Sequence, residues 1–229
     1  MKQAYFITGT DTNVGKTLIA GALLRAFACR GLRAVGMKPV AAGCEETGGV
    51  PHCADVASLL AAGNVAAPQE IVNPYALIPP VAPHIAAEQS GVEIRLEEIM
   101  RCFRELQKVA DIVVVEGVGG FMVPLNPRRN TADLAEILGL PVILVVGLRL
   151  GCLNHALLAA EAIERRGLRL AGWVANQVEP DLPFLPANVA ALEQRLPAPL
   201  LGAVPYCPGV DSSRAVEWLH ISFLENAWL

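Results

Sequence analysis

Residues 9–17 (GTDTNVGKT) constrain the fold and function of this chain more than any other segment. They follow an apolar run and precede a helical pattern that begins near Lys16. A glycine loop at such a junction offers backbone N–H groups and the positive end of a helix dipole to an anion. Lys16 can then reach the β- and γ-phosphates of a nucleotide, and the Thr17 hydroxyl can ligate Mg²⁺. The segment therefore predicts a phosphate-binding loop.

The spacing of the two glycines in this loop is irregular. Five residues separate Gly9 from Gly15, whereas the strict pattern has four and would place its first glycine at Thr10. The alternative is a glycine turn that merely begins a helix. Because residues 15–17 (GKT) stand at a strand–helix junction, phosphate binding is favoured over that alternative.

Short apolar runs alternate with helical patterns along the chain, which indicates an α/β fold. The predicted strands are residues 4–8, 32–37, 111–115, 142–146, 170–175 and 201–204, and the predicted helices are residues 16–29, 96–108, 133–138, 153–165 and 188–195. Because these strands are continuously apolar, helices must cover both faces of the sheet. We expect one domain over residues 1–229 with a P-loop NTPase-like fold and a mainly parallel sheet. Residues 79–80 and 180–186, rich in proline, are expected to form surface loops.

The composition indicates a folded chain that binds neither nucleic acid nor membrane. Hydrophobic residues make up 53% and charged residues 17%, which excludes disorder for most of the chain. The net charge is −4 and no block of lysine and arginine occurs, whereas a nucleic-acid surface needs clustered cations. The longest uncharged apolar stretch, residues 138–148, contains Pro141 and is shorter than the roughly 20 residues of a membrane helix. We expect it to be a buried strand.

The N-terminal residues and the cysteines favour a cytoplasmic location. Residues 1–7 lack the long apolar segment and the cleavage site of a secretory leader. The six cysteines include no pair at C-x-x-C spacing, so reduced thiols are expected. A zinc site at Cys44, His52 and Cys53 is not expected, because adjacent ligands rarely suit tetrahedral coordination.

A carboxylate stands at the carboxyl end of the strand predicted for residues 111–115. Because the ends of parallel strands meet at one edge of the sheet, Glu116 can hold Mg²⁺ beside the phosphate-binding loop. Gly117 and Gly119 allow backbone to approach a phosphate closely. Without the upstream loop, Glu116 would be interpreted as a solvated strand-end residue. With that loop, a role as metal ligand is favoured.

Lys38 directly follows the strand predicted for residues 32–37. In a parallel sheet this position faces the same crevice, so a second ammonium group can converge on a transferring phosphoryl group. Taken alone, Lys38 would be an ordinary surface lysine. Asp55 is a weaker candidate for a site residue, because a carboxylate at this position can simply favour the start of a helix.

The chain resembles the dethiobiotin synthetase family of ATP-dependent carboxylases nearly from end to end. The long glycine loop is itself a feature of that family. The matching segments are residues 8–17, 37–43, 72–75, 115–120, 150–155 and 172–176. The resemblance implies a homodimer that converts 7,8-diaminononanoate, CO₂ and MgATP into dethiobiotin, ADP and phosphate. It implies that a substrate amine becomes a carbamate, that a carbamate oxygen attacks the γ-phosphate, and that the second amine closes the ureido ring.

The same resemblance assigns roles to residues of this chain. Thr17, Asp55 and Glu116 would hold Mg²⁺, Lys16 would hold the phosphates, and Lys38 would support the carbamate and the transferring phosphoryl group. Such roles suit phosphoryl transfer, which depends on positioning and charge neutralisation. The nucleotide-binding residues implied are Asn13, Val14, Gly15, Lys16, Thr17, Leu18, Asp55, Glu116, Gly117, Val118, Gly119, Asn176, Gln177, Pro205, Tyr206 and Cys207. The substrate-binding residues implied are Thr12, Lys38, Ala42, Gly151, Cys152, Leu153 and Asn154, the last four supplied by the neighbouring subunit.

The chemistry of two segments suits these assignments. Asn176 follows the strand predicted for residues 170–175, and its carboxamide can pair with both the N6 donor and the N7 acceptor of adenine. Residues 151–154 open a predicted helix, whose free N–H groups attract an anion such as the carboxylate of the diamine substrate. The alternative is that residues 151–154 only begin a helix.

Two positions depart from the family pattern. The family often has Glu where this chain has Asn13, and often Ser where it has Ala42, near the substrate. Losing a neutral hydrogen bond typically costs about 0.5–1.5 kcal/mol. We therefore expect weaker substrate contacts at Ala42 rather than a lost reaction.

Two other classes of protein share some of these features. Dimeric ATP-switch proteins of the partitioning or iron-protein type have a second signature lysine early in the loop, where this chain has Thr10, Asp11 and Thr12. A glutamine-dependent amidotransferase would need a further domain with a nucleophilic cysteine, for which 229 residues leave no room. Both classes are therefore disfavoured.

Overall fold

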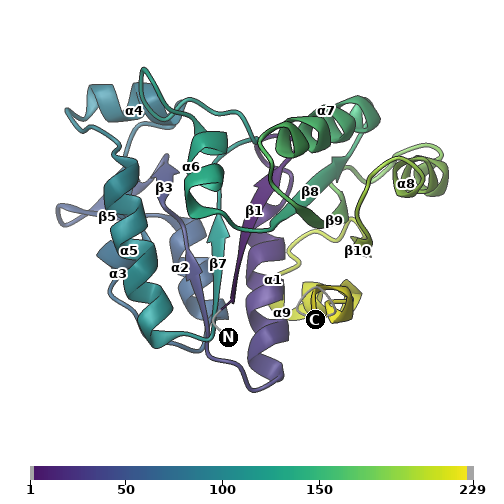
Figure 1. The fold of residues 1–229 in the computed structure, drawn as a ribbon, viewed down its shortest axis with the longest axis horizontal. Coiled ribbons are helices and arrows are strands. Elements are labelled where there is room, and N and C mark those ends of the chain that lie inside the picture. The colour runs from purple at the N-terminus through teal and green to yellow at the C-terminus, as the bar shows by residue number, and fades with distance from the viewer. Residues whose placement is uncertain (1–2, 226–229) are drawn as a thin grey trace.

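A computed structural model describes residues 3–225 of the chain. At its centre is a six-stranded sheet with the order β10-β9-β8-β1-β7-β2, whose paired strands run parallel. Helices cover both faces of this sheet (Figure 1). The predicted α/β fold with a mainly parallel sheet is confirmed. Residues 1–2 and 226–229, which the predicted domain also includes, lie outside the described residues.

The predicted strands and helices all form, with small differences at their ends. The strands of the central sheet are β1 (Gln3–Gly9), β2 (Ala34–Met37), β7 (Ile112–Glu116), β8 (Val142–Leu148), β9 (Leu170–Gln177) and β10 (Leu200–Val204). The predicted helices are α1 (Lys16–Cys29), α5 (Leu96–Val109), α6 (Thr131–Leu138), α7 (Cys152–Arg165) and α8 (Leu185–Glu193).

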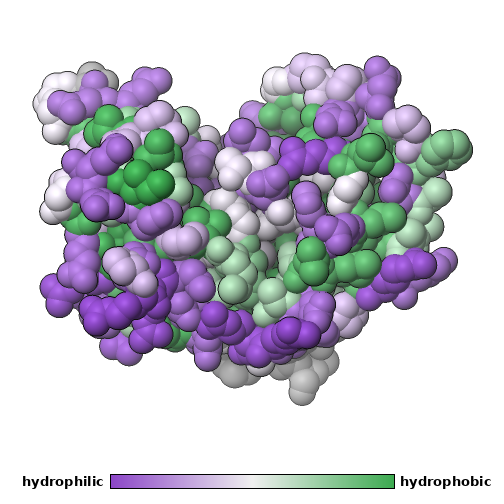
Figure 2. All heavy atoms as spheres, turned by 90° about the horizontal axis from the view of Figure 1, so that it is seen from above, coloured by the Kyte–Doolittle hydropathy of each residue, from purple (hydrophilic) through white to green (hydrophobic). Residues whose placement is uncertain are grey.

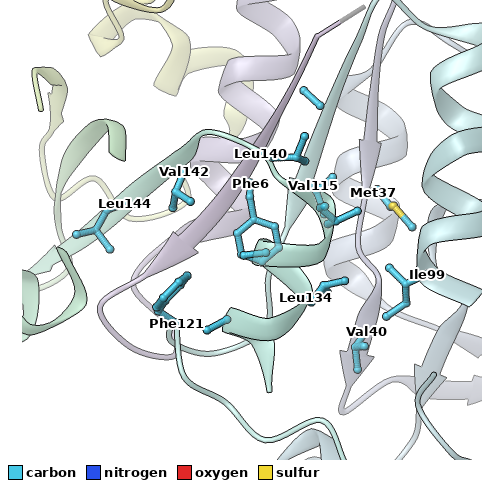
Figure 3. Packing of buried hydrophobic residues seen from close by; sticks show 14 of the residues in the cluster. Phe6, Met37, Val40, Ile99, Val115, Phe121, Leu134, Leu140, Val142 and Leu144 are labelled. Atoms are coloured by element: carbon cyan, nitrogen blue, oxygen red, sulfur yellow. The ribbon is translucent and has the colours of Figure 1, made fainter. Parts of the chain in front are cut away.

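Alternate residues of the strands pack into two apolar clusters, one on each face of the sheet. Phe6 and Val115 belong to the cluster that includes residues of α5, α6 and α7, whereas Tyr5 and Val114 belong to the cluster that includes α1. Figure 3 shows Phe6 and Val115 in the first cluster, near Leu134 of α6. Burial on both faces explains why these strands carry continuous apolar runs.

Several short elements were not predicted. Two small sheets flank the central one, and they pair β3 (Val40–Ala42) with β6 (Tyr75–Leu77) in parallel and β4 (Glu45–Thr47) with β5 (Val50–His52) in antiparallel fashion. Strands of three residues are too short to show a hydrophobic period. The other unpredicted elements are the helices α2 (Ala54–Ala62), α3 (Gln69–Val72), α4 (Pro83–Gln89), α9 (Ser212–Ala215) and α10 (Ser222–Glu225), and the 3₁₀ turn Val216–Trp218.

The expectation that all cysteines carry reduced thiols is wrong for one pair. Cys44 and Cys53 form a disulfide, and their Cα atoms lie 4.5 Å apart. Spacing along the chain could not reveal this pair, because the intervening hairpin β4–β5 is what brings the two ends together. The described cysteines with free thiols are Cys29, Cys102, Cys152 and Cys207.

Two predictions from local composition need adjustment. The stretch of residues 138–148 is not one strand, because Leu138 ends α6 and β8 begins only at Val142. An apolar run cannot by itself distinguish a helix end from a buried strand. The loop predicted for residues 180–186 is shorter than expected, since Pro186 lies in the first turn of α8. Within residues 3–225, no helix combines the length and the apolar character needed to cross a membrane.

Candidate active site

A cavity of about 510 Å³ lies where β1, β2 and β7 end. These strands end toward the top of Figure 1, and the view from above in Figure 2 shows this face of the molecule indented between two lobes. All of its lining residues belong to the site predicted from the sequence. They are Thr12, Asn13, Gly15, Lys16, Thr17, Lys38, Ala42, Asp55, Glu116, Val118 and Gly119.

Three other predicted residues lie next to this cavity without lining it. Val14 is buried beneath the loop, and its side chain occupies the space where a Cβ on Gly147 would stand. Leu18 lies in the first turn of α1 and is half-buried. Gly117 lines a small space behind Glu116.

The phosphate loop takes a backbone conformation that requires glycine at one position. Gly15 has φ 91°, and a Cβ there would overlap the side-chain amide of Asn176. Asn13, in the same loop, also has a positive φ of 57°. Lys16 then begins α1, and its Nζ donates a hydrogen bond to the carbonyl oxygen of Asp11 at 2.9 Å. The loop thereby holds a lysine ammonium group at the start of a helix, as anion binding requires.

Two carboxylates form a cluster with Lys38 and Thr17. Lys38 Nζ lies 2.5 Å from Glu116 Oε1 and 2.9 Å from Asp55 Oδ2. The Thr17 hydroxyl donates to Glu116 Oε1 at 2.8 Å. Lys38 is 3% exposed and Glu116 1%, so neither is the ordinary surface residue that each would be if taken alone. Asp55 lies in the first turn of α2 and also lines the cavity, so its position suits a site residue as well as the start of a helix.

Burial and neighbouring charges shift the pKa values of this cluster. Burial lowers the pKa of Lys38, but Glu116 and Asp55 outweigh that effect and hold it above the usual range. Burial raises the pKa of Asp55, but Lys38 outweighs that effect and holds it below the usual range. For Glu116, complete burial dominates and raises the pKa, although Lys38 opposes the shift. The Lys38 ammonium group and the Asp55 carboxylate are therefore the firmly charged members of the cluster.

The pKa of Lys16, unlike that of Lys38, is lowered. It falls to about 8, because burial and the nearby charge of Lys38 both disfavour the ammonium form of Lys16. We expect the affinity for ADP, measured without Mg²⁺ in EDTA, to fall as the pH rises through about 8. The fall should approach about tenfold per pH unit above that value, because only the charged lysine attracts phosphate. Isothermal titration calorimetry between pH 7 and 9.5 would measure this, since phosphate groups are already ionised there. An affinity independent of pH over this range would contradict the prediction.

Asn73 positions Lys38 and was not predicted as a site residue. Its side-chain amide donates to the carbonyl oxygens of Lys38 at 2.6 Å and of Tyr75 at 3.2 Å. Asn73 is buried, so these bonds tie the end of β2 to β6. The only sequence indication was its place within residues 72–75, one of the segments that match the family.

The residues predicted to bind the adenine base come together at the ends of β9 and β10. These strands pair in parallel, with Val204 opposite Asn176. The backbone N–H of Tyr206 donates to Gln177 Oε1 at 3.3 Å, which brings residues 205–207 beside Gln177. Asn176 is buried, and its side-chain amide donates to the carbonyl oxygen of Val14 at 2.8 Å. Asn176 thus links this pair of strands to the phosphate loop.

We expect Asn176→Ala to relax the discrimination between ATP and GTP. The second N–H of the amide and its oxygen suit the N6 and N7 edge of adenine, while the first N–H already bonds to Val14. The ratio of kcat/KM for the two nucleotides would measure the effect. If both KM values rise while their ratio stays constant, Asn176 only supports the phosphate loop.

Residues 151–154 do not line the cavity within this chain. Gly151 is the N-cap of α7 with φ 92°, Cys152 is buried, and Asn154 is exposed. A contact that was not predicted connects this region to the phosphate loop, because Arg149 forms an ion pair with Asp11. The helix start is therefore fixed next to the loop, yet it contributes nothing to the cavity of its own chain.

Comparisons with known proteins agree with this site. The family model described as an AAA domain matches residues 3–214. The curated ATP-dependent dethiobiotin synthetase BioD of Nitrosospira multiformis is 57% identical over 222 residues, which cover 97% of this chain and 96% of that protein. The protein of the same name from Janthinobacterium sp. (strain Marseille) is 51% identical over 225 residues, covering 96% and 95%.

Solved structures of similar shape come from proteins with much lower identity. The cell division ATPase MinD of Pyrococcus furiosus has a TM-score of 0.59 at 16% identity, covering 99% of this chain and 100% of that chain. A ParA family ATPase from Chlorobium tepidum has a TM-score of 0.58 at 13% identity, covering 99% and 93%. At such identities the likeness shows a shared P-loop NTPase fold and nothing of function. Because three curated proteins named ATP-dependent dethiobiotin synthetase share 51–57% of their residues with it over nearly their whole length, the chain belongs to the dethiobiotin synthetase family.

Proposed function

We propose that this chain carries out the ATP- and Mg²⁺-dependent carboxylation and ring closure of 7,8-diaminononanoate with CO₂, giving dethiobiotin, ADP and phosphate. The observation that carries the proposal is the cavity in which Lys16, Lys38 and the carboxylates of Asp55 and Glu116 meet. Two cations beside two carboxylates are the groups that phosphoryl transfer to a carbamate needs.

The residues present fit a magnesium ion. Glu116 Oε2 is buried and has no hydrogen-bond partner among the described residues, so this oxygen is available to a cation. The Thr17 hydroxyl and the Asp55 carboxylate lie in the same cavity. No cluster of three or more His, Cys, Asp or Glu side chains suited to a metal occurs among residues 3–225. A site with two carboxylates and a hydroxyl suits Mg²⁺, which usually binds one or two carboxylates together with substrate phosphates.

When bound, the ion would neutralise charge on the β- and γ-phosphates. Lys16, at the start of α1, would hold the same phosphates through its ammonium group. Lys38 would give up its contacts with Glu116 and Asp55, because a divalent cation competes for the same two carboxylates. Its ammonium group would then face the carbamate and the transferring phosphoryl group, where negative charge develops.

The reaction would proceed in three steps around these groups. One substrate amine adds to CO₂, forming a C–N bond and losing a proton. A carbamate oxygen then attacks the γ-phosphorus, and the bond between this phosphorus and the β–γ bridging oxygen breaks, releasing ADP. The second amine attacks the carbon of the resulting carbamic–phosphoric anhydride, loses a proton and expels phosphate. Positioning and charge neutralisation are the tasks left to the protein.

The test of the proposed function is incubation of the purified protein with diaminononanoate, bicarbonate and MgATP. We expect dethiobiotin to appear by mass spectrometry, with one ADP formed for each molecule of product. Glu116→Gln should shift the Mg²⁺ titration of this activity to clearly higher concentration. It should lower the melting temperature only slightly. ATP hydrolysis that ignores the diamine would instead favour an ATP-switch protein, the class whose fold this chain shares.

We further propose a cytoplasmic homodimer in which α7 of one subunit completes the substrate site of the other. The amines react near Lys38, whereas the substrate carboxylate lies at the far end of an aliphatic chain. The start of α7 can bind a carboxylate through its free N–H groups. Its absence from the cavity lining of its own chain supports a contribution to a neighbouring subunit.

Mixing two inactive variants should restore part of the activity if this composite site exists. Lys16→Met damages the phosphate side, and Asn154→Glu places a repelling charge at the start of α7. Asn154 is a better position than Gly151, whose φ of 92° would strain any side chain. Random exchange makes half of the dimers mixed, each with one intact site, so recovery should reach about one quarter of the normal activity.

Asn154→Gln is the matched control, and it should retain activity because it adds no charge. Subunit exchange would be verified with differently tagged chains. Exchanged mixed dimers that form no dethiobiotin would show that each substrate site is built from a single chain.

A further inference from the structure

The disulfide between Cys44 and Cys53 joins two segments that each contribute to the active-site cavity. Cys44 follows β3, whose last residue is Ala42, and Cys53 is the N-cap of α2, whose first turn carries Asp55. Both Ala42 and Asp55 line the cavity. A covalent bond therefore fixes the distance between the two segments at the edge of the site.

The disulfide holds Cys53, the N-cap residue directly before the turn of α2 that carries Asp55. Val56 and Leu59 are buried, and α2 packs against α1 and β2. By contrast, no side chain caps the helix at Cys53, so its first N–H groups lack that support. Breaking the disulfide would remove the covalent link between this turn and Cys44, and would leave the turn held by the Lys38–Asp55 ion pair and by the packing of Val56.

A second cavity gives access to the disulfide from outside the active site. It has a volume of about 300 Å³ and is lined by Cys53, Glu45, His52 and neighbouring residues of α2. Cys53 belongs to this lining, whereas Cys44 does not. A small thiol entering here would therefore meet Cys53 of the pair and not Cys44.

We propose that Cys44 and Cys53 form a reversible thiol–disulfide modification site that controls the position of Asp55. A thiolate of a dithiol reductant attacks Cys53 Sγ, the bond between the two protein sulfurs breaks, and Cys44 leaves as a thiolate that takes up a proton. The second thiol of the reductant then releases Cys53 as a thiol. Two electrons pass to the protein disulfide, and the reductant becomes a disulfide itself. The effect on metal binding rests on the proposed role of Asp55.

The first measurement identifies the redox state of each cysteine. Protein purified without reductant would be treated with one maleimide, reduced with dithiothreitol, and treated with a heavier maleimide before peptide mass spectrometry. Cys44 and Cys53 should carry only the heavier label, and the exposed Cys29 the lighter one. Lighter label on both Cys44 and Cys53 would overturn the proposal.

The second measurement compares the oxidised and reduced proteins. In the presence of ADP, reduction should raise the Mg²⁺ concentration at half-saturation by about tenfold, since loss of support for a metal ligand typically costs 10- to 100-fold in metal affinity. It should also speed amide hydrogen exchange at Ala57, whose N–H donates to the carbonyl oxygen of Cys53, while leaving residues 58–62 protected. Reoxidation by a small-molecule disulfide, which takes up the two electrons and two protons and becomes a pair of thiols, should reverse both changes. Equal Mg²⁺ titrations and equal exchange in the two states would refute the proposal.

Variants separate this site from the other thiols. Cys44→Ala should behave like the reduced protein and lose its response to dithiothreitol, whereas Cys29→Ala should keep the response of the native chain. If Cys44→Ala does not fold, the comparison of oxidised with reduced native protein still decides the matter. If no form makes dethiobiotin but the exchange rates differ, the proposed function fails and the modification site stands.

Discussion

Lys38→Met is expected to lower the rate of dethiobiotin formation by about 100- to 1000-fold, the loss typical when one group that stabilises transition-state charge is removed. The variant should still bind ADP with Mg²⁺ at least as tightly as the native chain. Lys38 shares Glu116 and Asp55 with the proposed metal site, so its removal frees these oxygens for the ion. Rapid-quench kinetics and calorimetry would measure the two effects. Near-normal turnover would remove Lys38 from the mechanism.

The stability of this variant provides a control on its interpretation. Lys38→Met leaves Glu116 as an unpaired buried carboxylate, and breaking a buried ion pair in this way typically costs about 3–5 kcal/mol. The double variant Lys38→Met/Glu116→Gln should regain most of that stability in urea unfolding. Because it should stay inactive, misfolding can be distinguished from the loss of the Lys38 ammonium group.

Lys16→Met should instead weaken nucleotide binding itself. A charged hydrogen bond to phosphate contributes about 1.5–3 kcal/mol, so the affinity for ADP should fall by about 10- to 100-fold and turnover should be lost with it. The free protein should be no less stable than the native chain, since burial already disfavours the charged form of Lys16 and lowers its pKa to about 8. Calorimetry with ADP and urea unfolding would test both statements.

The contrast between the two lysines makes the assignment testable. One variant should bind nucleotide, turn over poorly and be less stable, while the other should be stable and bind nucleotide weakly. If Lys16→Met bound ADP normally, the phosphates would lie elsewhere than beside α1. If both variants had the same profile, the separate roles of Lys16 and Lys38 would have to be abandoned.

The central sheet and the phosphate loop were predictable from local patterns in the sequence. Its strands are continuous apolar runs and α5 has clear helical periodicity, and such patterns are local in the sequence. Residues 9–17 combine a strand end, a glycine loop and a helix start in one short segment, so their geometry was also predictable. Glu116 and Lys38 followed by topology, because parallel strands end at the same edge of the sheet.

Which of these groups touch one another depends on the packing of segments that are distant in the chain. The pairing of Lys38 with Asp55 depends on α2, whose place is set by its packing against α1 and β2. The hydrogen bond from Asn73 to the Lys38 carbonyl oxygen depends on the pairing of two three-residue strands, β3 and β6. The disulfide between Cys44 and Cys53 depends on the short hairpin β4–β5. Such contacts join residues distant in the chain, and each is stabilised by burial and pairing with the rest of the fold. Local sequence patterns do not reveal these contacts, because the contacts stabilise the protein only once the distant segments have come together.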